Sequence, residues 1–182
     1  MPISSEDRAK LIMLARGAVQ SAVTRQPLPQ MANFSGVLAE QRGCFVTLTN
    51  AGRLRGCIGT FQPHLPLAQM IVEMGLAATE DPRFVYNPIT PGELPQLTIE
   101  VSVLSPLTET RDPLGLRIGE HGIYIIRGGR AGCFLPEVAT DMNWSAKQFL
   151  DECCTGKAGL PPGAWQLEGT KVYLFTSEKF DH

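Results

Sequence analysis

The chain has 182 residues, a length typical of one domain, and such a chain buries roughly 70% of the surface that it exposes when unfolded. The composition is 43% hydrophobic and 19% charged with a mean hydropathy of -0.01, which indicates an ordinary globular protein rather than a disordered or membrane protein. A net charge of -2 and a pI of about 5.9 argue against a surface that coats nucleic acid, although a local basic patch is compatible with them.

The N-terminal residues 1–7 are acidic and polar, without the basic and apolar regions of a secretory signal. No apolar run approaches the roughly 18 residues that span a bilayer. The cysteines are odd in number and form no Cys-x-x-Cys pair, which fits a reducing compartment better than a disulfide framework. The sequence therefore predicts a cytoplasmic protein. Its five cysteines are Cys44, Cys57, Cys133, Cys153 and Cys154.

The first half of the chain is predicted to contain a helix over 5–25, strands over 43–49 and 53–60, a helix over 67–78 and a strand over 97–104. Ser4 or Ser5 can cap the first helix, and the prolines at 27–29 end it. The turn residues 50–52 join the first two strands into an antiparallel hairpin. The second helix should stop before Asp81-Pro82, because the residue before a proline disfavours helical geometry.

The second half is predicted to contain strands over 122–127 and 130–135, a helix that begins at 145, and a last strand over 171–175. Gly128-Gly129 suits the positive φ angles of a hairpin turn. Ser145 and Gln148 form a capping box, and Gly156 can end that helix. Within it we expect Cys153 in the core and Cys154 near the surface.

Helices and hairpins alternate irregularly, without the βαβ repeat of a doubly wound sheet. This order predicts an α+β fold with a mainly antiparallel sheet and flanking helices. The chain has no internal repeat and no clear interdomain linker, so we expect one domain over 1–182.

The segment 54–60, Leu-Arg-Gly-Cys-Ile-Gly-Thr, is the strongest candidate for a functional centre. In an extended strand Arg55 and Cys57 share a face, and a nearby guanidinium favours a reactive thiolate. Gly56 and Gly59 leave room for a ligand or another backbone, and Thr60 adds a hydroxyl at the rim. The structural alternative is a buried Cys57, an ion pair at Arg55 and a glycine bulge.

Cysteine catalysis needs a base, and His121, which precedes a predicted strand, is the preferred candidate; its alternative role is capping or packing. Glu100 lies in an apolar strand, where it either orients Arg55, acts as an acid or base, or faces solvent on the polar side. Asp81 and Arg83 are predicted to line the site or to pair within a turn.

Two further patterns favour structure over chemistry. Arg127-Gly128-Gly129-Arg130 lacks the strand-to-helix context and the lysine of a P-loop, and therefore indicates a hairpin turn rather than a phosphate site. No two histidines have metal-ligand spacing and Cys153 and Cys154 are adjacent, so we predict no structural metal.

The segment 54–60 resembles the signature of the AMMECR-one domain family, also called protein A of the AmmeMemoRadiSam system. The resemblance covers nearly the whole chain. It includes the segments 45–48, 81–84, 100–104, 121–123, 134–136 and 157–160. Two positions depart from the family pattern: Glu137 stands where we expect glutamine, and Gly156 replaces a common apolar residue.

The resemblance implies an α+β fold of two unequal lobes around a cleft, with the signature segment near the cleft. It implies no established reaction and names no cofactor. Prokaryotic members accompany a Memo-like protein and a radical S-adenosylmethionine (SAM) protein, which implies a shared modification pathway.

The leading hypothesis is a small enzyme, or the partner of an enzyme, whose cleft binds a small molecule or modified side chain near Cys57 while Arg55 stabilises negative charge. A non-catalytic adaptor that docks a Memo-like protein through Arg55 is the first alternative. An RNA-associated protein is the second, and it requires four arginines to converge, which the acidic pI disfavours. These are Arg55, Arg83, Arg127 and Arg130.

Overall fold

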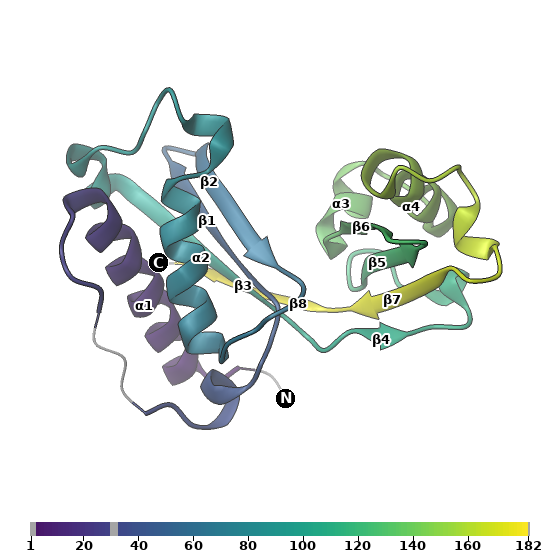
Figure 1. The fold of residues 1–182 in the computed structure, drawn as a ribbon, viewed down its shortest axis with the longest axis horizontal. Helices are drawn as coiled ribbons and strands as arrows, with labels where there is room; N and C mark the ends of the chain where they lie inside the picture. Colours follow the sequence, from purple (N-terminus) through teal and green to yellow (C-terminus); the bar gives the residue numbers. More distant parts are fainter. Residues whose placement is uncertain (1–2, 30–32, 182) are drawn as a thin grey trace. The chain divides into compact units, whose positions relative to one another are not determined.

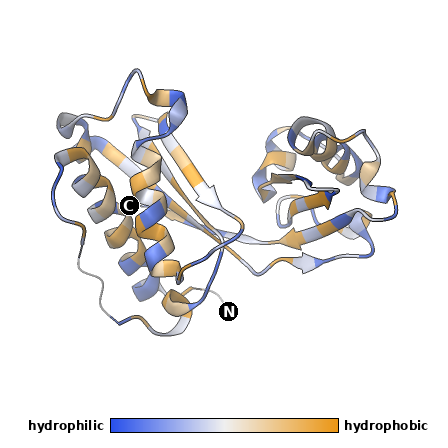
Figure 2. Ribbon diagram, in the orientation of Figure 1, coloured by the Kyte–Doolittle hydropathy of each residue, from blue (hydrophilic) through white to orange (hydrophobic). Residues whose placement is uncertain are grey.

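The structure, a computed structural model, describes residues 3–29 and 33–181 (Figure 1). It forms two compact units. The first comprises residues 1–104 and 178–182, and the second comprises residues 105–177. Each unit has a hydrophobic core of its own, and hydrophobic residues lie along the helices and strands of both (Figure 2).

The first unit is built on a four-stranded sheet in the order β2-β1-β3-β8. The strands are β1 (Cys44–Asn50), β2 (Arg53–Thr60), β3 (Leu97–Leu104) and β8 (Ser177–Asp181). β1 pairs antiparallel with both β2 and β3, and the predicted hairpin over 43–60 is therefore confirmed. β2 lies at one edge of the sheet, so one side of its backbone has no neighbouring strand.

Two helices, α1 (Ser5–Thr24) and α2 (Leu67–Thr79), cover one face of this sheet (Figure 1). Alternation along β1 turns Val46 and Leu48 toward this face, where they pair with Val101 and Ile99 of β3. All four side chains are buried in the first core. The side chains at intervening positions therefore lie on the opposite face.

The ends of the helices follow local rules. The side chain of Ser4 accepts a hydrogen bond from the backbone N–H of Asp7, which fixes the start of α1. α2 ends at Thr79, before Asp81-Pro82 as predicted. The described residues of this unit also form short 3-10 helices: η1 (Gly36–Ala39), η2 (Pro82–Phe84) and η3 (Pro91–Gln96).

The second unit has a four-stranded sheet in the order β4-β7-β5-β6. Its strands are β4 (Thr108–Glu109), β5 (Gly122–Arg127), β6 (Arg130–Phe134) and β7 (Lys171–Phe175). α3 (Pro136–Asp141) and α4 (Ala146–Cys153) lie beside it. The capping box of Ser145 and Gln148 is present, and the turn between β5 and β6 has φ angles of 53° at Gly128 and 79° at Gly129.

Two antiparallel sheets with flanking helices confirm the predicted α+β class. Some local predictions were wrong. α4 continues through a π-helical turn over Cys154–Ala158 and ends at Gly159, whose φ is 64°, rather than at Gly156. Cys154 is fully buried rather than near the surface. The sequence did not predict α3, β4 and β8, because each is too short to show a clear helical or strand period.

None of the helices in the part of the chain that the structure describes is both long and apolar enough to cross a membrane.

Candidate functional site

A β-bulge interrupts β2 at Arg55. Leu48 of β1 pairs with Gly56 and Thr49 pairs with Leu54, so Arg55 is the extra residue without a partner in the ladder. The alternation that the sequence suggested for Arg55 and Cys57 is broken between the two residues. Their side chains consequently bind different neighbours.

Arg55 forms an ion pair with Glu93 of η3. Its Nε donates to Glu93 Oε2 at 2.9 Å, and its Nη2 donates to Glu93 Oε1 at 3.1 Å and to the carbonyl of Pro88 at 3.2 Å. Thr90 completes a capping box with Glu93. These bonds, led by that of Arg55, lower the pKa of Glu93 to about 2. The ion pair thus joins the bulge to the loop before β3, as the structural alternative for Arg55 requires.

Cys57 lies on the face of the sheet opposite α1 and α2, directly across from Thr47. Thr47 Oγ1 lies 3.1 Å from Cys57 Sγ and donates to it. The main chain of Cys57 points outward from the edge of the sheet, where its N–H donates to Asp81 Oδ2 at 3.0 Å and its carbonyl accepts from Arg83 Nη2 at 3.2 Å. The half-buried thiol therefore contacts Thr47, and the main chain of the same residue is held by Asp81 and Arg83.

Asp81 and Arg83 take the place of a neighbouring strand at this edge. Asp81 accepts from the backbone of Arg83 and pairs with its guanidinium at 2.6 Å. The hydrogen bond from Arg83 is the main cause that holds the pKa of Asp81 far below its usual range. The side chain of Asp81 is 1% exposed and that of Arg83 is 57% exposed, so Arg83 can also reach a bound molecule. The predicted pairing turn is confirmed.

Glu100 lies in the same cross-strand row as Thr47 and Cys57. It is opposite Thr47 on β3, and its Oε1 lies 3.6 Å from Nζ of Lys179 on β8. Two strand spacings separate Glu100 from Cys57, or roughly 10 Å. This distance is too long for direct proton transfer to the thiol, but a molecule lying over Thr47 would meet both groups.

The two glycines of the segment have packing roles. A Cβ at Gly56 would lie 2.0 Å from the carbonyl oxygen of Ala78 at the end of α2. A Cβ at Gly59 would lie 2.2 Å from the ring of Phe45, its partner on β1. Glycine is therefore required here by a neighbouring backbone and by a neighbouring ring.

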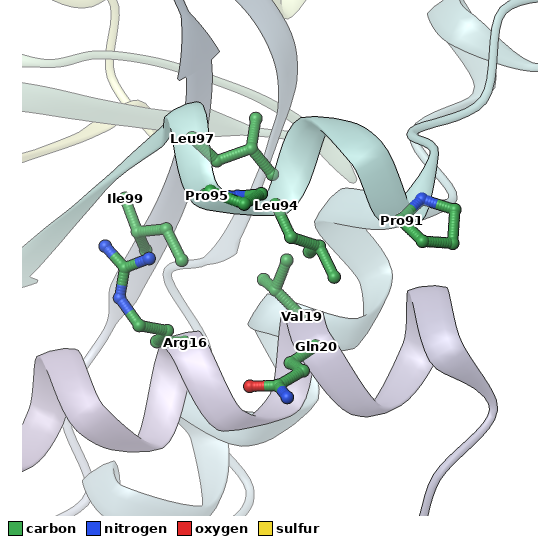
Figure 3. A pocket seen from close by; sticks show the side chains of 8 residues that line it. All are labelled: Arg16, Val19, Gln20, Pro91, Leu94, Pro95, Leu97 and Ile99. Carbon is green, nitrogen blue, oxygen red and sulfur yellow. The ribbon is translucent and has the colours of Figure 1, made fainter.

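Among the described residues of the first unit, cavities lie on two sides of η3. One, of about 490 Å³, lies at the turn between β1 and β2, where Arg55 and Glu93 line it. The other, of about 380 Å³, lies between α1 and η3, and Figure 3 shows Val19, Leu94 and Ile99 pointing into it. The second cavity is mainly apolar and holds none of the predicted site residues.

The model of the AMMECR1 family matches residues 12–180, nearly the full length. The chain belongs to the AMMECR1 family. It is 38% identical to a protein of Methanothermobacter thermautotrophicus, covering 98% of this chain and 96% of that protein. It is 39% identical to protein TK0174 of Thermococcus kodakarensis, covering 94% and 88% respectively.

The AMMECR1 fold is also found in a solved structure, the crystal structure of uncharacterized protein PH0010 from Pyrococcus horikoshii. This chain matches it with a TM-score of 0.81 and 35% identity, covering 94% of this chain and 89% of that one. The likeness extends over both units. The names of these relatives state no reaction.

In this AMMECR1 chain, the first unit brings Cys57, Asp81 and Arg83 together and places Glu100 in their row. His121 belongs to the second unit, where its Nδ1 accepts from the backbone N–H of Arg117 at 3.1 Å. Thr60 Oγ1 accepts from the backbone N–H of Gln62 at 3.0 Å.

The four other cysteines differ from Cys57 in their surroundings. Burial raises the pKa of Cys44 to about 12 and raises those of Cys133, Cys153 and Cys154. All five thiols are free.

Sequence reasoning missed Thr47, Glu93 and Lys179. Thr47 could not have been found from the hairpin, because a two-residue turn at 51–52 alone pairs Thr47 with Gly56, and the bulge at Arg55 moves Cys57 opposite it. The Thr90-Pro-Gly-Glu93 pattern is a capping-box signal that could have marked η3. Lys179 had no signal, since it reaches Glu100 only through the return of β8 to the first sheet.

Proposed function

We propose that this chain is an enzyme, or the partner of an enzyme, that holds a small molecule or a modified side chain against the thiol of Cys57. The observation that carries the proposal is a half-buried thiol that accepts a hydrogen bond from Thr47, on a residue whose main chain is held by Asp81 and Arg83. A cysteine that only fills space needs no hydroxyl donor at its sulfur. The Memo-like and radical SAM proteins that accompany members of the family are the proposed partners, in a shared pathway that modifies the bound molecule or side chain.

Arg83 is the group proposed to receive negative charge on the bound molecule. Sequence reasoning gave this role to Arg55, but the guanidinium of Arg55 lies against Glu93 and the carbonyl of Pro88 rather than beside Cys57. Arg83 reaches the carbonyl of Cys57 and remains 57% exposed. Glu100 is proposed to act on the bound molecule across Thr47, and His121, in the second unit, is proposed as a base.

Alkylation tests the thiol. Iodoacetamide should modify Cys57 at least about tenfold faster than any other cysteine, because Cys44, Cys153 and Cys154 are buried and desolvation raises the pKa of the half-buried Cys133. Peptide mass mapping of a time course gives each rate. Modification of Cys57 at the rate of Cys133 or slower would rule out an accessible thiol.

A charged reagent tests Arg83. The preference of Cys57 for anionic iodoacetate over neutral iodoacetamide should fall severalfold in Arg83→Gln, because the guanidinium attracts the carboxylate. Lys10→Gln, a charge change on the opposite side of the sheet, is the matched control and should leave the preference unchanged. An unchanged preference in Arg83→Gln would remove Arg83 from the site.

A non-catalytic adaptor is the second candidate, and exposed side chains after η2 favour it. Tyr86 is 100% exposed and Val85 is 65% exposed, close in sequence to Arg83. Tyrosine and arginine are common anchors of protein interfaces. If the chain is an adaptor, Tyr86→Ala should abolish capture of a purified Memo-like protein while Cys57→Ser retains it. If the thiol is the functional group, Cys57→Ser should stop the modification of the substrate even where capture persists.

RNA binding receives no support from the arginines named for it. Arg55 and Arg83 pair with Glu93 and Asp81. Arg127 and Arg130 donate to backbone carbonyls of Glu168 and Gly159.

A further inference from the structure

The cavity at the turn between β1 and β2 has the size of a small-molecule site. Its volume is about 490 Å³, within the usual range for ligand pockets of about 300 to 1,000 Å³. Its walls come from the β1–β2 hairpin, the loop before η3 and η3 itself. The lining residues are Asn50, Ala51, Arg53, Arg55, Asn87 and Glu93.

The charge in this cavity can be counted from its hydrogen bonds. Glu93 is saturated: its two oxygens accept from Arg55, from Asn50 Nδ2 and from the backbone and side chain of Thr90. The single negative charge of Glu93 cancels the positive charge of Arg55. Arg53 is exposed and has no ion-pair partner in residues 3–29 and 33–181. The cavity therefore presents one net positive charge.

Two kinds of donor remain available there. Arg55 Nη1 makes no hydrogen bond to the described residues. The atom is not fully buried, so it is open to solvent. The side-chain amide of Asn87, also exposed, has no partner within the same ranges. Asn50 uses its amide nitrogen on Glu93, which leaves its carbonyl oxygen as an acceptor.

The buried part of this arrangement is fixed before any molecule binds. Arg55, with a side chain that is 9% exposed, is held by two oxygens of Glu93 and by the carbonyl of Pro88, which leaves one direction for Nη1. Ala51, at the turn, has a φ of 48°, a left-handed conformation that costs an alanine about 1 kcal/mol. Positive φ angles at Ala51 and Gly52 are those of a two-residue hairpin turn, and this turn forms part of the cavity wall.

We propose that this cavity binds a small molecule with a single carboxylate and at least one amide or hydroxyl group. The carboxylate accepts from Arg53 and from Nη1 of Arg55, and the second group bonds to the amides of Asn50 and Asn87. A carboxylate matches the one net positive charge, whereas a phosphate dianion would leave one charge uncompensated. The site is separate from Cys57 and does not depend on the function proposed there.

Titration with a matched pair of probes tests the proposal. N-acetylglycine carries a carboxylate and an amide, and N-acetylglycinamide has the same amide without the charge. N-acetylglycine should produce saturable shifts in the ¹H–¹⁵N resonances of Ala51, Arg53 and Asn87, with an apparent Kd at least about tenfold lower than that of the uncharged probe. Equal binding of the two probes, or no saturation by either, would overturn the proposal.

Variants separate this site from the Cys57 site without disturbing the buried ion pair. Arg53→Gln should weaken N-acetylglycine by at least about tenfold, while Lys10→Gln and Cys57→Ser should leave its Kd unchanged. Inorganic phosphate should bind more weakly than N-acetylglycine. Tighter binding of phosphate, or an unchanged Kd in Arg53→Gln, would contradict the carboxylate assignment.

Discussion

Arg55 and Cys57 are two residues apart, yet they have different partners. Arg55 is the bulged residue and binds Glu93, while Cys57 lies in register with Thr47 and is held by Asp81 and Arg83. One extra residue in a strand is enough to separate two side chains that strict alternation would place on one face. The motif therefore contains a structural half and a candidate chemical half.

The ion pair at Glu93 predicts a pH dependence of stability. The pKa of the Glu93 carboxyl falls from an ordinary value of 4.5 to about 2 on folding, so the folded state binds fewer protons between these two values. The stability that the ionised carboxylate contributes is therefore fully present above about pH 4.5 and is lost as the pH falls toward about 2. In Glu93→Gln, the free energy of unfolding should be lower than that of the wild type near neutral pH. That difference should shrink by about pH 3.

Urea unfolding across this pH range measures the effect. Glu80→Gln is a suitable control, because the exposed side chain of Glu80 has no hydrogen bond or ion pair to the described residues. It should follow the wild type throughout. A gap between Glu93→Gln and the wild type that stays constant over the whole range would show that ionisation of Glu93 does not contribute.

At the scale of elements, β2 approaches the end of α2 closely at Gly56. A Cβ at Gly56 would lie 2.0 Å from the carbonyl oxygen of Ala78, a backbone atom that cannot move alone. Gly56→Ala should therefore destabilise the protein by about 3 kcal/mol, as an overpacked core position does. Thermal or urea unfolding followed by circular dichroism measures the loss.

Gly92 provides the matched control in the same unit. Its φ is not in the left-handed region, and the nearest atom to an added Cβ would be Thr90 Oγ1 at 3.9 Å. Gly92→Ala should be neutral or stabilising by up to about 1 kcal/mol, because alanine loses less backbone entropy on folding. Equal destabilisation by the two substitutions would mean that the contact with Ala78 is not the cause.

At the scale of the whole molecule, the chain has two cores, and the second unit is inserted between β3 and β8 of the first. Both tryptophans, Trp144 and Trp165, belong to the second unit. Tryptophan fluorescence therefore reports on that unit, whereas far-ultraviolet circular dichroism reports on both. This difference allows the prediction of one domain over 1–182 to be tested.

Because each unit has its own core, a substitution in one should leave the transition of the other largely in place. Gly56→Ala should lower the midpoint of the part of the circular dichroism transition that comes from the first unit. The midpoint of the fluorescence transition should stay unchanged. Phe149→Ala, which removes a fully buried ring from the second core, should lower the fluorescence midpoint. If either variant shifts both signals equally, the two units unfold as one domain.

The sequence by itself determined the local structure. Helical spacing, capping residues and turn residues are short-range signals, and they predicted α1, α2, α4 and both hairpins, together with the turn in which Asp81 pairs with Arg83. The motif at 54–60 also located Arg55 and Cys57 on one strand, and the resemblance gave the family.

Only the tertiary structure decided what each of these residues contacts. The bulge that separates Arg55 from Cys57, the approach of Glu93 to Arg55 and the pairing of Glu100 with Lys179 of β8 depend on strand register and on segments distant in sequence. Such contacts form because burial of a shared core brings the segments together, and no local pattern encodes that geometry. For this reason the sequence predicted Cys57 as a candidate residue, but only the fold shows that the guanidinium beside it is that of Arg83. The guanidinium of Arg55 instead pairs with Glu93.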